Sequence, residues 1–269
     1  MTKEYDFYIV PTPVGNIKDI TLRALEILKT VDLIACEDSR VTQKLLNHYD
    51  IKTKTISYHK YNEKKRVDEI INYIQQGKKI ALVSDAGMPM ICDPGNILLE
   101  ELIKNNITIT SLAGACAIPT FLSQVPRESE IYTFIGFFPK TEQKAKEIVT
   151  QHAKTNLVFY ESPKRIIKTL EFIKSVRGEV KVAIARELTK LFEETKINNI
   201  SNIIKYYESG VKGEIVCMVY NQEDFNEFNL NSKINTLKAD GFKSKEIAKI
   251  LSSLYGINKN KIYNLAKDL

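Results

Sequence analysis

The first 122 residues alternate between short apolar runs and segments in which apolar residues recur at helical spacing. Strand-like runs lie at residues 5–10, 32–35, 53–57, 79–84 and 107–112. Each is followed by a segment with helical periodicity, the last at residues 115–122. Strands separated by helices pair in parallel, because each helix returns the chain to the same end of the sheet. We therefore expect a parallel sheet covered by helices on both faces.

A second part of the chain has a different order of elements. A polar stretch with a proline at residues 123–130 separates it from the first. Strand-like runs then lie at residues 131–137, 157–160, 180–185, 191–197 and 214–220, with helical segments at 142–152, 164–176 and 200–207. Because several strands follow one another without a helix, we expect a mixed sheet. The predicted α/β domains span residues 1–122 and 130–221.

The C-terminal residues carry most of the positive charge. Residues 233–269 contain eight Lys and three acidic residues, a net charge of +5, whereas the first 232 residues carry +1. Three short helical patterns in this segment predict a small helical module resembling a helix-turn-helix. Clustered lysines gain free energy from phosphates by counterion release, so a polyanionic partner is one interpretation. A solvated lysine-rich surface is the other.

Composition excludes several classes of protein. The four Cys lie far apart and form no C-x-x-C pair, which argues against a disulfide framework and a zinc site. We interpret them as buried apolar residues and expect no bound metal. Three His residues give little support for Ser-His-Asp catalysis. The charged first residues and the lack of a stretch of about 18 apolar residues predict a cytoplasmic protein without a membrane segment.

Three unusual loops follow predicted strands of the first domain. Residues 11–16 and 84–95 are rich in Gly and Pro, and residues 113–117 are small and open a helix. In open parallel sheets ligands bind beyond the carboxyl ends of the strands, and small residues expose backbone donors there. Neither G-x-G-x-x-G nor the P-loop pattern occurs, which disfavours hydride and phosphoryl transfer. The loops predict a ligand site at this edge of the sheet.

Six motifs taken together resemble those of the tetrapyrrole methylase superfamily, and within it the methyltransferases of ribosomal RNA. They lie at residues 10–16, 19–25, 37–40, 84–95, 159–163 and 186–190, in the expected order within residues 5–221. This sequence departs from the usual pattern at Met88, where Thr is usual, at Cys92, where Ser is usual, and in Ala113-Gly114-Ala115-Cys116-Ala117.

The resemblance implies a function as well as a fold. It implies two α/β domains with S-adenosylmethionine in the cleft between them, usually in a homodimer. The implied activity is 2′-O-ribose methylation of a decoding-region cytidine of 16S rRNA, cytidine 1402 in the usual numbering. The partner would be 16S rRNA or the small ribosomal subunit.

The candidate catalytic residues follow the second predicted strand. A ribose hydroxyl is a poor nucleophile, so a carboxylate that accepts its proton would help. Glu37-Asp38-Ser39-Arg40 offers two carboxylates and a guanidinium. The resemblance favours Asp38 as the base, with Glu37 as the alternative, Asp85 as a competitor and Arg40 near a phosphate. A helix N-cap formed by Asp38 or Ser39 is the structural interpretation of the same residues.

The resemblance and the loops together give the expected cofactor contacts. They are Pro11, Ser84, Asp85, Ala86, Gly87, Pro89, Gly114, Ala115, Tyr160, Leu188, Gly213 and Glu214. Two other functions stay open at this point. One is methylation of a tetrapyrrole or corrin precursor, and the other is a non-catalytic RNA-binding assembly factor that keeps the methylase fold.

Overall fold

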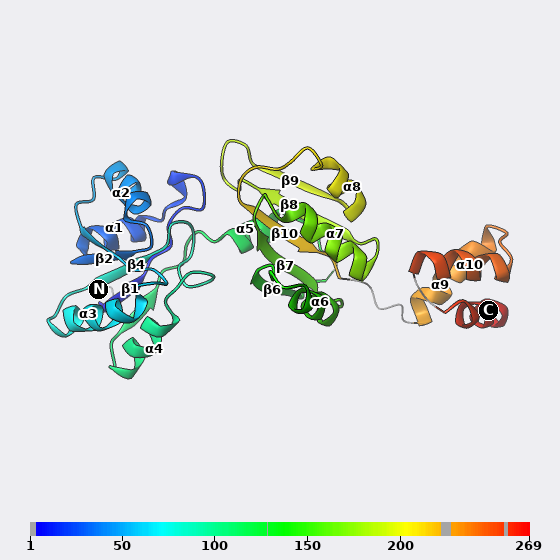
Figure 1. The fold of residues 1–269 in the computed structure, drawn as a ribbon, viewed down its shortest axis with the longest axis horizontal. Helices are drawn as coiled ribbons and strands as arrows, with labels where there is room; N and C mark the ends of the chain where they lie inside the picture. The colour runs from blue at the N-terminus through cyan, green and yellow to red at the C-terminus, as the bar shows by residue number, and fades with distance from the viewer. Residues whose placement is uncertain (1–3, 128, 222–226, 256–257) are drawn as a thin grey trace. The chain divides into compact units, whose positions relative to one another are not determined.

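The computed structural model describes residues 4–127, 129–221, 227–255 and 258–269. The described residues up to Asn221 form one compact unit, and those from Glu227 onward form a second (Figure 1). Both predicted α/β parts lie within the first unit. No helix in the described ranges is both long enough and apolar enough to cross a membrane.

The first sheet is wholly parallel, as the alternation of elements predicts. Its strands are β1 (Phe7–Ile9), β2 (Leu33–Cys36), β3 (Lys54–Ser57), β4 (Ile80–Val83) and β5 (Ile109–Ser111), in the order β3-β2-β4-β1-β5. Helices α1 (Leu22–Thr30) and α2 (Ser39–His48) bury apolar side chains on one face, and α3 (Glu63–Gln75) and α4 (Asn96–Lys104) on the other (Figure 1). A 3₁₀ turn, η1 (Ile17–Asp19), precedes α1.

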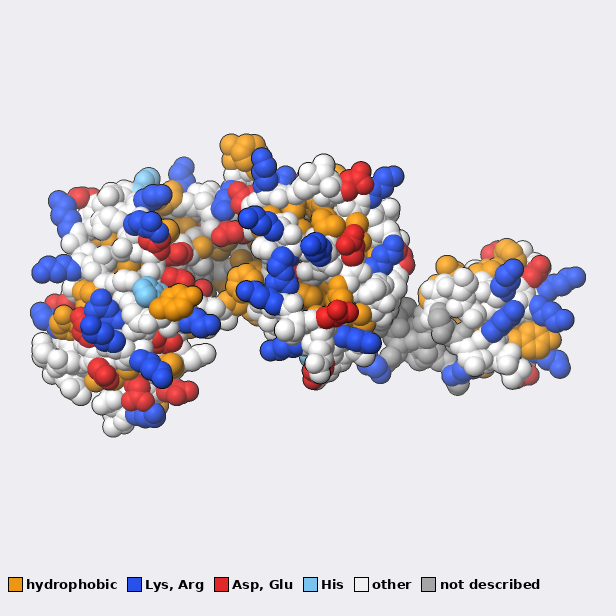
Figure 2. Space-filling model, in the orientation of Figure 1, with side chains coloured by type: hydrophobic (Ala, Val, Ile, Leu, Met, Phe, Trp, Pro, Cys, Tyr) orange, Lys and Arg blue, Asp and Glu red, His pale blue; other side chains and the backbone are white. Residues whose placement is uncertain are grey.

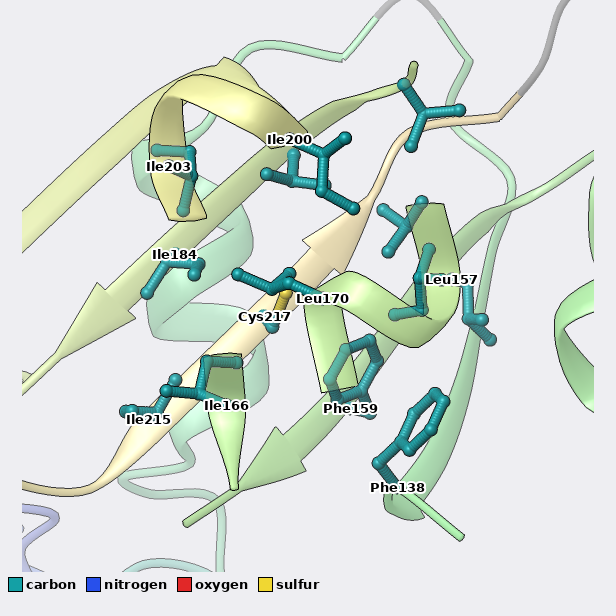
Figure 3. Close-up of a cluster of buried hydrophobic side chains, with 14 of the residues drawn as sticks. Phe138, Leu157, Phe159, Ile166, Leu170, Ile184, Ile200, Ile203, Ile215 and Cys217 are labelled. Atoms are coloured by element: carbon teal, nitrogen blue, oxygen red, sulfur yellow. The ribbon is translucent and has the colours of Figure 1, made fainter. Parts of the chain in front are cut away.

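The second sheet is mixed, which confirms the prediction from its strand order. It contains β6 (Tyr132–Phe137), β7 (Asn156–Glu161), β8 (Lys181–Arg186), β9 (Glu194–Asn199) and β10 (Ile215–Val219), in the order β6-β7-β10-β8-β9. Only β6 and β7 pair in parallel. Helices α6 (Glu142–Gln151), α7 (Ile166–Arg177) and α8 (Ile200–Tyr206) pack on one face. Figure 3 shows the buried side chains that α7, α8 and the strands contribute to this core.

Helix α5 (Ala117–Gln124) packs against the other face of this second sheet. Its buried residues Ile118, Phe121 and Leu122 belong to the same cluster as Val158 and Val216 of the strands. The alternating pattern predicts that the first domain extends to residue 122. The buried face of α5, at the end of that range, packs on the second sheet.

The C-terminal unit consists of α9 (Glu227–Ala239), α10 (Ser244–Tyr255) and α11 (Lys259–Asp268). Leu230, Ile234, Ile247, Leu251 and Ile262 are buried together and form its core. The three helices match the three predicted patterns, although α9 begins earlier than predicted. The sequence is polar and Asn-rich at residues 222–231, and residues 222–226 of this segment lie outside the described residues. A core of its own indicates that this unit folds as a module.

Candidate active site

A cavity of about 380 Å³ opens beside the carboxyl edge of the first sheet, a size typical of small-molecule sites. The loops after β1, β4 and β5 contribute to it, together with the ends of β7, β8 and the start of β10. Its lining residues are Val14, Asp85, Ala86, Gly87, Met88, Ile91, Cys92, Asp93, Cys116, Ala117, Phe137, Tyr160, Glu161, Ser162, Pro163, Leu188, Glu214, Ile215 and Val216. The cavity therefore occupies the place where open parallel sheets bind ligands.

The loop after β4 is fastened to the loop after β1. Thr12 and Gly87 exchange backbone hydrogen bonds of 2.9 and 3.0 Å, and Thr12 Oγ1 donates to the Ser84 carbonyl oxygen at 3.0 Å. Ser84 Oγ donates to the Gly87 carbonyl oxygen at 3.1 Å. Gly87 has a φ of +77°, which glycine adopts without strain. This turn presents residues 85–88 to the cavity.

Half of the residues predicted to contact the cofactor line this cavity, namely Asp85, Ala86, Gly87, Tyr160, Leu188 and Glu214. The others do not line it: Pro11, Ser84, Pro89, Gly114, Ala115 and Gly213. For two of these residues, Gly114 and Gly213, close packing explains why the position is a glycine. A Cβ on Gly114 would lie 2.9 Å from the Pro11 side chain, and one on Gly213 would overlap the Glu187 side chain. These two glycines allow close packing of loops that border the site.

Most of the apolar cavity wall could not be predicted from the sequence. Phe137, Ile215 and Val216 come from strands of the second sheet, and only the tertiary structure brings them to the loops of the first. The interpretation of all four Cys as buried was wrong for Cys92, which is exposed, and for Cys116, which is half-buried. Both line the cavity. Both also lie in the loops selected from the sequence, at residues 84–95 and 113–117, so their positions could have identified them as site residues.

The second half supplies an aromatic wall and a buried carboxylate. The Tyr160 ring packs against Phe134 and Phe137, with centroid distances of 5.2 and 5.5 Å. Glu161 Oε1 accepts from the Ser162 N–H at 2.7 Å, and Oε2 accepts from Thr169 Oγ1 at 2.7 Å. These bonds, with Arg165 at 3.3 Å, satisfy the carboxylate where β7 meets α7. Glu161 therefore fixes the backbone beside Tyr160.

The loop that carries Leu188 is held in a strained conformation. Glu187 and Thr189 have φ values of 52° and 64°, a region that non-glycine residues rarely adopt. Lys190 Nζ bonds to Glu187 and Glu214 at 3.0 and 3.2 Å, and the Asn16 N–H donates to Thr189 Oγ1 at 2.9 Å. The ion pairs of Lys190 hold the loop to the residue before β10, and the hydrogen bond from Asn16 holds it to the first half. Such strain persists only where the surroundings fix it.

Three carboxyl groups with raised pKa values gather at the cavity edge: Glu37, Asp85 and Asp93. Burial, and then Asp85 and Asp93, raise the pKa of Glu37. Burial raises the pKa of Asp85, although its Oδ1 accepts a hydrogen bond from the Asp38 N–H at 3.0 Å. Burial and then Asp85 raise the pKa of Asp93. We call these three residues the acidic group, and two of them, Asp85 and Asp93, line the cavity.

Asp38 has a different environment. Its Oδ1 caps α2 by accepting from the Arg40 N–H at 2.9 Å, and the Arg40 guanidinium donates to both carboxylate oxygens at 3.0 and 2.6 Å. The side-chain hydrogen bond from Arg40 lowers the pKa of Asp38 to about 2. A carboxylate with so low a pKa is a weak base. Neither Asp38 nor Arg40 is among the residues that line the cavity.

A sequence model of Tetrapyrrole (Corrin/Porphyrin) Methylases matches residues 6–204. The match covers the first sheet, strands β6 to β9 of the second, and the loops that line the cavity up to Leu188. The chain therefore belongs to the tetrapyrrole methylase family.

Within that family, nearly full-length relatives share one name, Ribosomal RNA small subunit methyltransferase I. The protein from Streptococcus pyogenes serotype M3 is 38% identical, covering 97% of this chain and 94% of the relative. The one from Halalkalibacterium halodurans is 38% identical, covering 96% and 93%. The one from Hydrogenobaculum sp. is 43% identical, covering 79% and 94%.

Two solved structures share the fold of this chain at low sequence identity. Diphthine synthase aligns with a TM-score of 0.66 at 11% identity, covering 83% of this chain and 92% of that one. Cobalt precorrin-4 methyltransferase aligns with a TM-score of 0.57 at 15% identity, covering 80% and 94%. The arrangement of two α/β halves is therefore that of the methylase family.

The family takes its methyl group from S-adenosylmethionine, and the cavity fits this cofactor. Four carboxyl groups line it, on Asp85, Asp93, Glu161 and Glu214, and none of the described lining residues is Lys, Arg or His. S-adenosylmethionine carries a positive sulfonium and an ammonium group, which an acidic lining stabilises. The apolar residues Val14, Leu188 and Val216 and the ring of Tyr160 offer surfaces for its adenine.

Proposed function

We propose that this chain methylates the 2′-hydroxyl of a ribose in 16S rRNA, at a cytidine of the decoding region. The observation that carries the proposal is the similarity, over nearly the whole chain, to proteins named Ribosomal RNA small subunit methyltransferase I. S-adenosylmethionine supplies an electrophilic methyl group when bound, so the protein's task is to align the hydroxyl and remove its proton. We also propose that the enzyme acts in the cytoplasm and that it is a homodimer. Its mass in solution would test the dimer.

Asp85 is the proton acceptor that the geometry supports best. It lines the cavity, it follows β4 at the carboxyl edge, and its pKa is raised by burial. The Asp38 N–H holds its Oδ1, so the carboxylate has a fixed position. A base whose pKa is raised toward neutral pH accepts a proton more effectively than an ordinary carboxylate. Asp38, selected from the sequence, then positions Asp85 and Arg40.

The relatives argue against a tetrapyrrole substrate. Proteins that match nearly the whole chain at 38% identity are named for ribosomal RNA, whereas cobalt precorrin-4 methyltransferase aligns at only 15% identity. Ribosomal RNA presents a neutral ribose hydroxyl to the site, while its phosphates can contact basic residues elsewhere.

Mapping of ribose methylation tests the proposed function. The 16S rRNA of a strain lacking the gene should have lost one 2′-O-methyl group at a decoding-region cytidine, and complementation should restore it. An unchanged methylation pattern between the two strains would refute the proposal. Purified protein that binds no S-adenosylmethionine in isothermal titration would favour the assembly-factor alternative.

We propose that Arg40 contacts an RNA phosphate near the target ribose. Its side chain is 86% exposed, and its Nε and Nη2 donate hydrogen bonds to the Asp38 carboxylate. Arg40 Nη1 donates no hydrogen bond to any of the described residues. Arg40→Ala should lower the slope of log affinity against log salt by about 0.7 to 0.9, the value for one phosphate contact. RNA affinity that stays the same at several salt concentrations would contradict this contact.

We propose that the C-terminal unit adds affinity for rRNA without shaping the cavity. The described residues that line the cavity all lie between Val14 and Val216, and the C-terminal unit has its own core. A chain ending at Asn221 should therefore fold and bind S-adenosylmethionine normally. Its RNA affinity should fall, with a salt slope smaller by about 0.7 to 0.9 for each lost phosphate contact. An unchanged slope with a changed mass in solution would show that the unit serves self-association instead.

A further inference from the structure

Residues Tyr58–Asn62, between β3 and α3, form a tight turn that we call the Tyr61 turn. Three hydrogen bonds of Asn62 hold this turn in place. The His59 N–H donates to Asn62 Oδ1 at 2.8 Å, the Asn62 N–H donates to the His59 carbonyl oxygen at 2.9 Å, and Asn62 Nδ2 donates to the Ser57 carbonyl oxygen at 3.0 Å. The backbone that carries Tyr61 is therefore held in one conformation.

The side chain of Tyr61 projects into solvent from this fixed turn. It is 96% exposed, the largest value among the exposed large hydrophobic residues of the described chain. Among the described aromatic rings, it contacts the edge of the His59 ring, at a centroid distance of 6.1 Å. An aromatic ring in this position adds nothing to the core. Its faces are available to a partner, and a rigid turn lowers the entropy cost of binding.

The turn and the first turn of α3 are basic. Four basic residues and one acidic residue between Tyr58 and Arg66 give a net charge of +3, against +1 for the first 232 residues together. Lys60, Lys64 and Lys65 are exposed, and none of them forms an ion pair with any described residue. Figure 2 shows hydrophobic, histidine and basic side chains side by side on the visible face of the first α/β half.

The position of the turn relates it to the active site. Strands β3 and β2 pair in parallel, so the Tyr61 turn follows β3 at the same edge where Glu37 and Asp38 follow β2. Tyr58, Glu37 and Asp93 line one small hollow, and Asp93 also lines the cavity. A nucleic acid strand that reaches the cavity along this edge would pass the turn.

We propose that the Tyr61 turn binds single-stranded RNA, with the Tyr61 ring stacked on an unpaired base that flanks the methylated nucleotide. Lys60, Lys64 and Lys65 contact the phosphates of the same strand. Aromatic side chains stack on any base, and proteins that act on single-stranded RNA combine such rings with basic residues. The proposal rests on the proposed function, because it takes RNA as the substrate.

The test measures binding of a fluorescein-labelled single-stranded RNA of decoding-region sequence, about 12 nucleotides long, within the usual site sizes. Tyr61→Ala should weaken binding by about 5- to 150-fold, the loss expected for one base stack. Its salt slope should stay unchanged, because no charge is lost, and Tyr61→Phe should bind like the wild type. Lys60→Ala, Lys64→Ala and Lys65→Ala should each lower the salt slope by about 0.7.

Two matched variants serve as controls. Tyr132 is 45% exposed and lies at the end of β6 away from the cavity, since Phe137 at the other end pairs with Tyr160. Lys29 is exposed in the last turn of α1, which precedes the amino end of β2. Tyr132→Ala and Lys29→Ala should leave RNA binding unchanged. Because Tyr61 is so exposed, Tyr61→Ala should also keep the melting temperature and the cofactor affinity of the wild type.

The outcomes separate the inference from the proposed function. A wild-type enzyme that leaves 16S rRNA unmethylated would refute the proposed function itself. A wild type that methylates rRNA, with Tyr61→Ala equal to it in RNA affinity and KM, would refute only the role of the Tyr61 turn. A Tyr61→Ala variant with normal RNA affinity but a changed mass in sedimentation would assign the turn to self-association and also overturn the inference.

Discussion

Asp85→Asn should lower the turnover of rRNA methylation by about 10²- to 10⁴-fold, the usual contribution of a general base. Asn can still accept the hydrogen bond from the Asp38 N–H, so the loop after β4 should keep its conformation. The variant removes a carboxylate whose charge is disfavoured by burial, and we expect no loss of thermal stability at neutral pH. Turnover measured at saturating S-adenosylmethionine, beside cofactor affinity from isothermal titration, separates catalysis from binding.

The pH dependence of the wild type provides a second measurement for the same residue. A base must be deprotonated to act, so turnover should fall as pH decreases through the pKa of Asp85. Because burial raises that pKa, the fall should occur at a higher pH than for an ordinary Asp. Glu37 and Asp93 interact with Asp85, so the profile reports the acidic group as a whole.

Asp38→Asn is the matched comparison. Asn is as good an N-cap as Asp, so α2 should be preserved, while the charged pair with Arg40 is lost. Its effect on turnover should be much smaller than that of Asp85→Asn. A larger loss of turnover in Asp38→Asn than in Asp85→Asn would identify Asp38 as the base instead. A normal turnover of Asp85→Asn with reduced cofactor affinity would make Asp85 a binding residue only.

The fold could be predicted from the sequence to a large extent, because local pattern determines most of it. Alternating strands and helices predict the parallel first sheet, and consecutive strands predict the mixed second one. The place of α5 could not be predicted in this way. Its apolar face fits either sheet, and only tertiary packing decides that Phe121 joins the core of the second.

The candidate site could be predicted only in part. The loop at residues 84–95 stands out because Gly and Pro permit turns that other residues do not, and it does line the cavity. The apolar wall has no such local signal, since Phe137 or Val216 looks like any strand residue. The choice among Asp38, Glu37 and Asp85 also lies beyond sequence reasoning. The choice depends on the tertiary structure, which places the Arg40 guanidinium beside Asp38 and buries Asp85 near Glu37 and Asp93.

Gly87→Leu should lower the affinity for S-adenosylmethionine by about 100-fold or more. A Cβ at this position would lie 3.6 Å from Val14 Cγ2 and 4.0 Å from Cys116 Cα, and both residues line the cavity. The remaining atoms of a leucine side chain must therefore displace the wall or occupy the cavity. Overpacking of about 3 kcal/mol in the bound state corresponds to such a loss. Gly87→Ala adds only the tolerated Cβ and should bind more tightly than Gly87→Leu.

The control must carry the same backbone strain without touching the cavity, and Gly77 provides it. Its φ is +81°, close to the +77° of Gly87, and a Cβ there would meet nothing within 4 Å. A side chain at such a φ costs about 1–2 kcal/mol at either position. Gly77→Leu and Gly87→Leu should thus lose similar thermal stability, while Gly77→Leu binds the cofactor normally. Undiminished affinity in Gly87→Leu would remove the loop after β4 from the cofactor site.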